Sequence, residues 1–161
     1  MASVYVLIGL PACGKSTWRE KHLAANPTVD FAIISSDDMV EEIAREKGIT
    51  YDEAHKIVDW KSVNTRMKYR FRDALKAGKD VIVDRTNMSR KSRKMFLKDL
   101  PEGYETVAVN FQICDHELRR RLDARAEATG KSIPADVLKS MSDRYVAPER
   151  EEFTRVVRVT E

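Results

Sequence analysis

The fold is decided by Gly9-Leu10-Pro11-Ala12-Cys13-Gly14-Lys15-Ser16-Thr17, a segment that matches the pattern GxxxxGK[ST]. An apolar run from Val4 to Ile8 precedes it, and residues of helical type follow it. Its glycines allow the backbone to curl so that successive N–H groups point inward, and the following helix presents its positive end there. The segment, called the phosphate loop below, is therefore predicted to cradle the phosphates of a nucleotide.

Each side chain of the phosphate loop has an expected task. Lys15 is predicted to reach the β- and γ-phosphates, and Ser16 to give its hydroxyl to Mg²⁺, which prefers oxygen ligands. A chance match of the bare pattern arises in roughly one chain in a few hundred of this length, and the strand–helix context makes chance rarer still. The residues predicted to bind the nucleotide are Gly9, Pro11, Ala12, Cys13, Gly14, Lys15, Ser16 and Thr17.

Five short runs rich in β-branched residues alternate with segments of helical type. They are Val4–Ile8, Phe31–Ile34, Val81–Val83, Thr106–Phe111 and Val156–Val159. Alternation of strands with helices indicates a parallel sheet, and apolar residues in succession indicate strands covered on both faces. We expect a single α/β domain over residues 1–161, a three-layer sandwich with a five-stranded, mainly parallel sheet.

Helix signals divide the rest of the chain. Thr50 and Glu53 form a capping-box pattern that predicts a long helical segment ending at Gly78. Its predicted buried stripe is Ala54, Ile57, Val58, Met67, Phe71, Ala74 and Leu75. After a break between Gly130 and Pro134, a short helix is expected over Asp136–Tyr145.

Composition excludes several classes of protein. The 29 basic and 26 acidic residues give a net charge of +3, too weak to indicate a nucleic-acid partner by itself. Cys13 and Cys114 belong to no CxxC pair, and His22, His55 and His116 stand alone, so a zinc or disulfide framework is not expected. The run Val4–Leu10 is too short to span a membrane and lacks the flanks of a signal peptide. We expect a soluble cytoplasmic protein with no membrane partner.

Two carboxylates end the second predicted strand, at the sheet edge where parallel α/β folds bind ligands. Phosphoryl transfer to an alcohol needs a carboxylate that orients the hydroxyl and accepts its proton, and Asp37 is predicted to be that base. Asp38 is expected to cap a helix that begins near Met39. The alternative is that both aspartates only cap that helix.

The third strand also ends in polar residues, Asp84-Arg85-Thr86-Asn87. Asp84 is predicted to hold an Mg²⁺-bound water or the acceptor sugar, and the four residues, with Asp37, form the predicted acceptor site. Six basic residues without an acid follow over fourteen positions, and they predict phosphodiester binding: Arg85, Arg90, Lys91, Arg93, Lys94 and Lys98. The alternative is a solvated helix face.

A basic helix is predicted from His116 to Ala128, within a lid over residues 116–134. Arg121 and Arg125 stand four apart, on one helix face, where both guanidinium groups can stabilise the charge of a phosphoryl-transfer transition state. They complete the predicted catalytic set with Lys15 and Asp37. The alternative is a helix held by internal salt bridges, because Glu117 and Arg121 are also four apart.

With these residues in hand, the chain resembles the kinase domain of bacteriophage and animal polynucleotide 5′-hydroxyl kinases, within the P-loop kinases. The resemblance rests on the phosphate loop, Asp37-Asp38, the Asp84–Asn87 step, the two lid arginines and Ile133-Pro-Ala-Asp-Val-Leu138. It implies transfer of the γ-phosphoryl group of ATP or another nucleoside triphosphate, with Mg²⁺, to the 5′-hydroxyl end of RNA or DNA. It implies the same roles for Lys15, Ser16, Asp37, Asp84, Arg121 and Arg125.

The chain departs from that family at several points. Ala12 stands where relatives often have glycine, and Val40 where some phage relatives place an acceptor-binding arginine, for which Arg85 is the proposed substitute. Relatives commonly continue into, or follow, a phosphatase or ligase module, and no DxDGT-type phosphatase signature is present in this sequence. The chain is expected to be either a stand-alone kinase or an excised domain, with such a module as an expected partner. Two other functions stay open: a kinase for a small metabolite or nucleoside, and a nucleotide-dependent binding module without catalysis.

Overall fold

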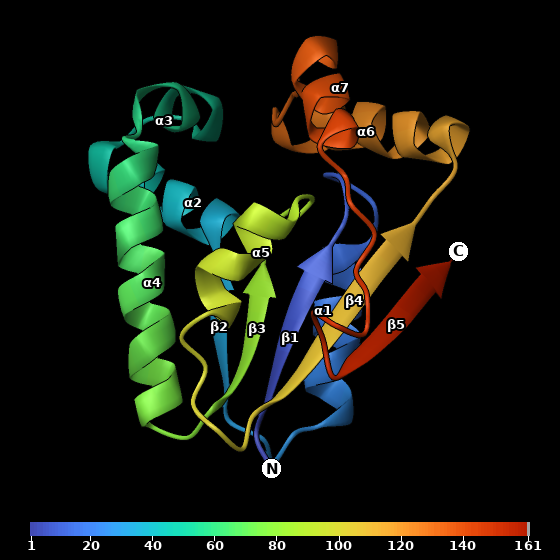
Figure 1. Cartoon of the computed structure of the whole chain (residues 1–161). Coiled ribbons are helices and arrows are strands. Elements are labelled where there is room, and N and C mark those ends of the chain that lie inside the picture. The colour runs from blue at the N-terminus through green and yellow to red at the C-terminus, as the bar shows by residue number, and fades with distance from the viewer. Residues whose placement is uncertain (161) are drawn as a thin grey trace.

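A computed structural model describes residues 1–160, which fold as alternating strands and helices. The strands are β1 (Ser3–Ile8), β2 (Phe31–Ser35), β3 (Asp80–Asp84), β4 (Glu105–Gln112) and β5 (Arg155–Thr160). The helices are α1 (Lys15–Ala25), α2 (Ser36–Lys47), α3 (Tyr51–Ile57), α4 (Trp60–Lys76), α5 (Arg90–Leu97), α6 (Asp115–Thr129) and α7 (Ala135–Asp143). The strands form one sheet in the order β2-β3-β1-β4-β5 (Figure 1). Every pair is parallel, so the predicted sheet is confirmed and is parallel throughout.

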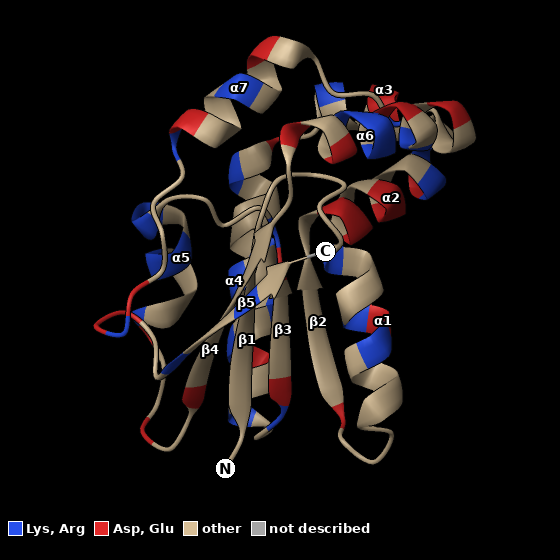
Figure 2. Cartoon of the chain, turned by 90° about the vertical axis from the view of Figure 1, so that its right-hand side faces the viewer, with Lys and Arg blue, Asp and Glu red and all other residues tan. Residues whose placement is uncertain are grey.

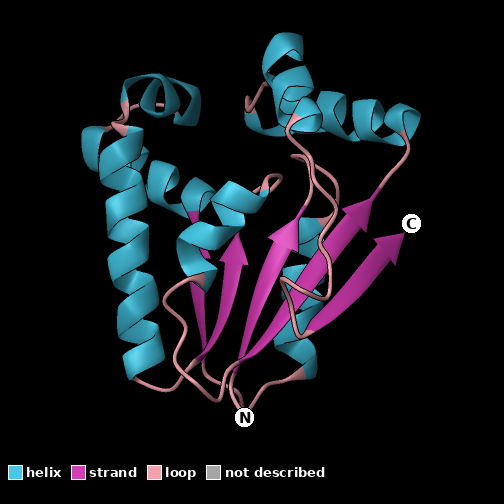
Figure 3. Ribbon diagram, viewed as in Figure 1, coloured by secondary structure: helices cyan, strands magenta, loops and turns pink. Residues whose placement is uncertain are grey.

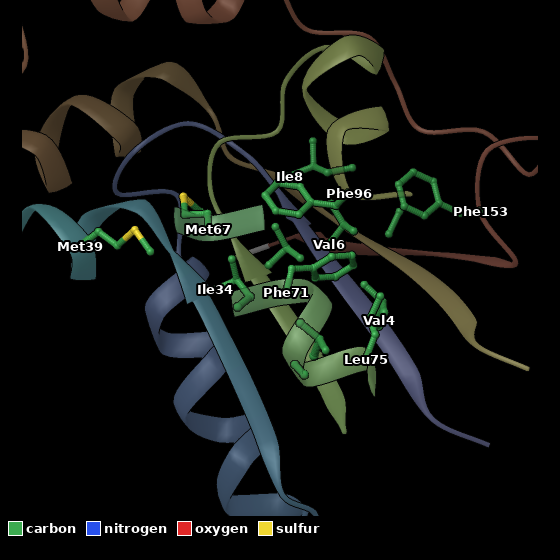
Figure 4. Packing of buried hydrophobic residues seen from close by; sticks show 14 of the residues in the cluster. Val4, Val6, Ile8, Ile34, Met39, Met67, Phe71, Leu75, Phe96 and Phe153 are labelled. Atoms are coloured by element: carbon green, nitrogen blue, oxygen red, sulfur yellow. The ribbon is translucent and has the colours of Figure 1, made fainter. Parts of the chain in front are cut away.

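Helices cover both faces of the sheet, as the consecutive apolar residues predicted (Figures 2 and 3). On one face Val4, Val6 and Ile8 of β1 pack with Phe71 of α4 and Phe96 of α5 (Figure 4). Those two rings meet edge to face with centroids 5.2 Å apart, and each buried ring contributes about 1.5–3 kcal/mol of hydrophobic stabilisation. On the other face a second cluster of buried residues packs against α1, including Leu7, Ile82 and Val107 with Trp18 and Leu23. The three-layer architecture follows from this alternation of β1 side chains.

The long helix predicted from Thr50 to Gly78 is wrong, because the chain forms two helices there. Thr50 and Glu53 make the expected capping box at the start of α3. Val58 is then extended, with φ −67° and ψ 138°, and the Asp59 side chain accepts from the Lys61 N–H to open α4. Asp59 is therefore a second helix cap, which the continuous helical pattern of the sequence did not reveal.

The predicted buried stripe holds except at one position. Ile57, in the last turn of α3, is 60% exposed, and its place in the stripe is therefore wrong. The break at Val58 explains the error, because the register of α3 does not continue into α4. The other members are buried or partly buried: Ala54, Val58, Met67, Phe71, Ala74 and Leu75.

Helix α2 begins earlier than predicted. The Ser35 hydroxyl accepts from the Asp38 N–H at 3.2 Å, so Ser35 is the cap and the prediction that Asp38 caps a helix near Met39 is wrong. Both aspartates lie in the first turn, where negative charge is favoured by the helix dipole. The short helix after Gly130 is confirmed as α7. Within residues 1–160, no helix has the length and apolar character that crossing a bilayer requires.

Polar segments gather where the parallel strands end. The phosphate loop follows β1, Asp37 lies just beyond β2, and Asp84 ends β3. Helices α2 and α3 lie beyond this edge of the sheet on one side, and α6 and α7 lie beyond it on the other (Figure 1). The candidate functional residues therefore come from elements that meet at one edge.

Candidate active site

The phosphate loop presents unused backbone donors. In the described chain, the N–H groups of Ala12, Gly14, Lys15, Ser16 and Thr17 donate to no acceptor. Ala12 and Gly14 have positive φ angles, 64° and 108°, which turn the peptide planes of the loop. Such a row of N–H groups before a helix N-terminus is an anion-binding arrangement.

Tight packing beneath the phosphate loop requires glycine at its first position. A Cβ atom at Gly9 would lie 2.4 Å from the Cys13 Sγ, closer than two such atoms can approach. The Gly9 N–H donates to the Thr86 carbonyl at 3.0 Å, so the segment after β3 holds the loop from one side. Cys13 is buried and burial raises the pKa of its thiol, which keeps it protonated as a packing residue.

Lys15 is folded over its own loop. Its ammonium group donates to the carbonyl oxygens of Gly9 at 2.8 Å and Leu10 at 2.9 Å. These are weak substitutes for phosphate oxygens, because hydrogen bonds between charged partners are about twice as strong as those to neutral acceptors. The lysine is therefore held at the loop, ready to exchange carbonyl partners for a polyphosphate.

The residues present fit a magnesium ion that is bound through phosphates. Within the described chain, no group of three or more His, Cys, Asp or Glu side chains could hold a metal. Mg²⁺ commonly binds through one or two protein oxygens together with substrate phosphates and waters. Ser16, whose side chain is exposed at the start of α1, is the loop oxygen available for this role.

Asp84 is the most buried carboxylate of the site, with 11% of its side chain exposed. Burial raises its pKa, whereas the nearby charges of Lys15 and Arg19 lower it and those of Asp37 and Asp38 raise it. Charges on the phosphate loop, α1 and α2 therefore all act on this one carboxyl group at the end of β3.

Arg19 joins two of these carboxylates and was missed by the sequence analysis. Its Nη1 lies 2.8 Å from Asp84 Oδ2 and 3.7 Å from Asp38 Oδ2. One signal could have found it, because Arg19 stands four residues after Lys15 and so shares its face of α1. Its positive charge offsets the repulsion between the two acids.

Asp37 is held by two elements other than its own helix. The Tyr51 hydroxyl, from α3, donates to Asp37 Oδ1 at 2.7 Å, and Arg125 Nη2, from α6, lies 3.7 Å from Asp37 Oδ2. Burial and then the charge of Asp37 raise the pKa of Tyr51, which keeps the phenol protonated as a donor. Sequence spacing gave no signal for Tyr51, because the turn between α2 and α3 brings it to Asp37.

The predicted lid contacts the loop and the acceptor side. Arg121 Nη1 lies 3.6 Å from the point where a side chain at Gly14 would begin. Arg121 Nε also donates to Glu117 at 2.8 Å, so the salt bridge considered as an alternative is present as well. Glu117 bonds Arg120 in addition, and these two partners lower its pKa to about 2.

Residues after α6 fasten this region to α2 and α3. Lys131 pairs with Glu41 of α2, and its ammonium group lies 4.4 Å from the centre of the Tyr51 ring. Ser132 Oγ is 3.5 Å from Asp52. Helix α6 and the segment after it therefore contact both α2 and α3 around Asp37.

The three residues after β3 have different surroundings: Arg85 is a cation without a described acidic partner, whereas Thr86 and Asn87 support the neighbouring backbone. Arg85 is half-buried, burial lowers its pKa, and its guanidinium lies 5.9 Å from the Phe96 ring centre with no described carboxylate within 4.0 Å. Thr86 accepts the Gly9 N–H bond described above. Asn87, 2% exposed with φ 49°, donates from Nδ2 to the Leu7 carbonyl at 2.7 Å.

The basic run after Arg85 does not act as one surface. Arg93 is fully buried, forms a two-pronged ion pair with Glu152 at 2.6 and 3.0 Å, and donates to three backbone carbonyls. Its predicted part in phosphodiester binding is wrong, since a fully buried guanidinium whose three nitrogens all donate inside the protein reaches no ligand. Arg90 is exposed but pairs with Glu149 at 2.6 Å.

Comparison with known families assigns the chain. A family model described as an AAA domain matches residues 4–148. The chain belongs to this AAA domain family. It is also 24% identical over 157 residues to heterogeneous nuclear ribonucleoprotein U-like protein 2 from Mus musculus and from Homo sapiens. That alignment covers 91% of this chain but 20% of the relative, so the chain spans a fifth of the length of these curated proteins.

Solved structures share the fold at low sequence identity. A proposed kinase from Chloroflexus aurantiacus matches with a TM-score of 0.73 and 13% identity, over 99% of this chain and 85% of its own. A chain of the Pnkp1/Rnl/Hen1 RNA repair complex matches with 0.67 and 23%, over 89% and 43%. A gluconokinase from Sinorhizobium meliloti 1021 matches with 0.60 and 21%, over 99% and 82%. This AAA domain protein therefore shares the α/β fold of P-loop kinases.

Proposed function

We propose that the protein transfers the γ-phosphoryl group of ATP or another nucleoside triphosphate to the 5′-hydroxyl end of RNA or DNA. One observation carries the proposal: the Asp37 carboxylate is held by Tyr51 at 2.7 Å and faced by Arg125 at 3.7 Å. A carboxylate fixed beside a phosphate loop and a lid arginine is what phosphoryl transfer to an alcohol requires.

The donor side relies on the phosphate loop. Its free N–H groups bind phosphate oxygens, with Gly9, Pro11 and Cys13 shaping the backbone beneath them, and Lys15 leaves its two carbonyl partners for the β- and γ-phosphates. Ser16 contributes its hydroxyl to the magnesium ion, whose charge neutralises the phosphates when it is bound. Thr17 adds a backbone donor at the start of α1.

The acceptor side relies on Asp37. With Oδ1 engaged by Tyr51, Oδ2 is the oxygen available to accept the proton of the incoming hydroxyl as its O–P bond forms. Arg121 beside the loop and Arg125 beside the base stabilise charge on the non-bridging oxygens of the transferring group. Tyr51 and Arg19 act as positioning residues, because they contact Asp37 and Asp84 and not the reacting atoms.

The grip on the acceptor differs from the one that the resemblance implies. Val40, where some phage relatives have an arginine, is fully buried on α2 and contributes only packing. Arg85 is half-buried without an acidic partner, and an anion there would stabilise its charge. In the proposal Arg85 binds the acceptor phosphate and Asp84 the acceptor sugar, while Thr86 and Asn87 support this segment against the loop.

The proposed setting is the cytoplasm, with a phosphatase or ligase module as partner. The name of the RNA repair complex that matches in fold supports a repair setting. The second candidate function is a small-molecule kinase, which the match to a gluconokinase favours. A binding module without catalysis is the third, and a held Asp37 argues against it, since binding alone needs no base.

A transfer assay with labelled γ-phosphate tests the proposal. The acceptors are 5′-hydroxyl RNA, 5′-hydroxyl DNA, nucleosides and gluconate, each with wild type and Asp37→Asn. We expect label on the nucleic acids and a fall in kcat of about 10²–10⁴-fold in Asp37→Asn with nucleotide binding retained. Label on the small acceptors only would reject the polynucleotide assignment, and undiminished activity of Asp37→Asn would reject Asp37 as base.

A further inference from the structure

Positive charge is concentrated on two neighbouring helices. Helices α4 and α5 together hold ten of the 29 basic residues and one of the 26 acidic ones, so they carry +9 while the rest of the chain carries −6. They contact each other on one face of the sheet. Lys and Arg mark α5 and the visible part of α4 in Figure 2. Arg93 is buried and paired with Glu152, but the other nine basic residues still leave these two helices far more positive than the rest of the chain.

Five cations of α4, α5 and the C-cap of α5 lie on adjoining sides of the two helices without a described acidic partner. Arg72 pairs with Asp99, just after α5, which turns that side of α4 towards α5. Lys61 and Lys68 share this side of α4, at spacings of eleven and four residues from Arg72. Across from them, three lysines spaced three and four apart lie along α5 and its cap. These five, Lys61, Lys68, Lys91, Lys94 and Lys98, form no described ion pair and are called the α4–α5 face.

Two aromatic side chains accompany the charges. Tyr69 is 62% exposed on the outer side of α4, and Trp60 is 38% exposed at its first residue. Large exposed aromatics are uncommon without a partner, and a mixture of cations and aromatic rings is the composition of single-stranded nucleic-acid sites. An acidic protein segment would use the cations but gains less from the rings.

The face begins at the candidate active site. Helix α4 starts directly after α3, whose Tyr51 holds Asp37, and α5 starts six residues after Asp84. Arg85, the half-buried cation without a described carboxylate partner, directly follows Asp84 and contacts Phe96 of α5. Helix α4 has 17 residues and so leads about 25 Å away from the sheet edge. A strand whose 5′ end reached Asp37 would thus find positive charge along its path.

We infer that the α4–α5 face binds the backbone of a single-stranded RNA or DNA, with Tyr69 and Trp60 stacking on its bases. The inference rests on the proposed function for the direction of the strand, but the binding itself needs no catalysis. Each phosphate neutralised on a single strand contributes about −0.7 to the slope of log K against log salt concentration. Binding through this face should therefore weaken steeply as salt rises.

The test is equilibrium binding of a fluorescent 20-nucleotide RNA that carries a 5′-phosphate. Binding is measured by fluorescence anisotropy in the absence of any nucleoside triphosphate. Such an RNA cannot be an acceptor, so the result does not depend on phosphoryl transfer. The test variant is Lys68→Gln with Lys91→Gln and Lys94→Gln. The matched control is Lys21→Gln with Lys47→Gln and Arg158→Gln, three exposed cations away from α4 and α5 with the same change of net charge.

We expect the test variant to bind at least tenfold more weakly at low salt, with a salt slope reduced by about 2, and the control to bind like wild type. Tyr69→Ala should weaken binding by about fivefold or more. Equal losses in both triple variants, or no RNA binding at low salt, would overturn the inference. So would a polyglutamate peptide that binds as tightly as the RNA and ignores Tyr69→Ala.

Discussion

The two halves of the candidate site are built in different ways. The phosphate loop is made by nine consecutive residues and works through backbone N–H groups, whose directions depend on φ and ψ. The acceptor side is made by side chains from α2, α3 and α6 that meet at Asp37. A backbone site keeps its ligand class through many substitutions, whereas a side-chain site changes its ligand with one. This difference explains why the fold indicates a triphosphate site more firmly than it indicates an acceptor.

Loss of Lys15 should give the largest effect and tests the donor half. Lys15→Ala leaves the loop backbone in place but removes the one charged side chain among residues 9–17. We expect kcat to fall by about 10²–10³-fold, as for loss of a group that stabilises transition-state charge. Steady-state transfer assays measure it, with Lys21→Ala on the exposed side of α1 as the control. A fall confined to the KM of the triphosphate would mean that Lys15 only binds.

Tyr51→Phe should give a smaller effect and tests the acceptor half. The change removes the hydroxyl that donates to Asp37 Oδ1 but keeps the ring beneath Lys131. We expect kcat to fall by about tenfold, the cost of one hydrogen bond to a charged group, with the triphosphate KM unchanged. The control is Tyr69→Phe on α4. Equal losses in kcat and in thermal stability would instead indicate a structural role for the Tyr51 hydroxyl.

Ala12→Gly should give the smallest effect and tests whether the backbone of the phosphate loop is strained at this position. Ala12 has φ 64°, a conformation that costs a residue with a Cβ about 1 kcal/mol and costs glycine little. Thermal unfolding should show an increase of no more than about 1 kcal/mol in stability, because glycine also gains freedom in the unfolded chain. The control is Ala24→Gly within α1, which should destabilise the protein. Destabilisation of similar size in both variants would contradict strain at Ala12.

The sequence predicted the parts of the fold that depend on neighbouring residues. All five strands, the phosphate loop and α7 follow from local pattern, and the strand–helix alternation fixes the parallel sheet. It failed where a distant contact decides the outcome. The cap at Asp59 was lost in a continuous helical pattern, and Arg93 looked like a surface cation because its partner Glu152 lies 59 residues further along the chain.

The same limit applies to the candidate site. Asp37, Asp84 and the lid arginines were found because they follow strands or repeat at helical spacing. Tyr51 and Lys131 were not, since they reach Asp37 and Glu41 through turns whose geometry no short pattern encodes. Arg19 could have been found from helical spacing, because it stands four residues after Lys15. Its role became apparent only in the structure, where Asp38 of α2 and Asp84 of β3 meet at its guanidinium.

The close approach of Cys13 to Gly9 limits which sequences this loop can accept. Because a Cβ at position 9 would overlap the sulfur, alanine there is compatible only with a smaller residue at position 13. The Cβ of Phe111, 3.1 Å from the same point, limits even that double change. In a library of variants, substitutions at positions 9 and 13 should therefore show strong epistasis, with pairs tolerated that neither single exchange predicts.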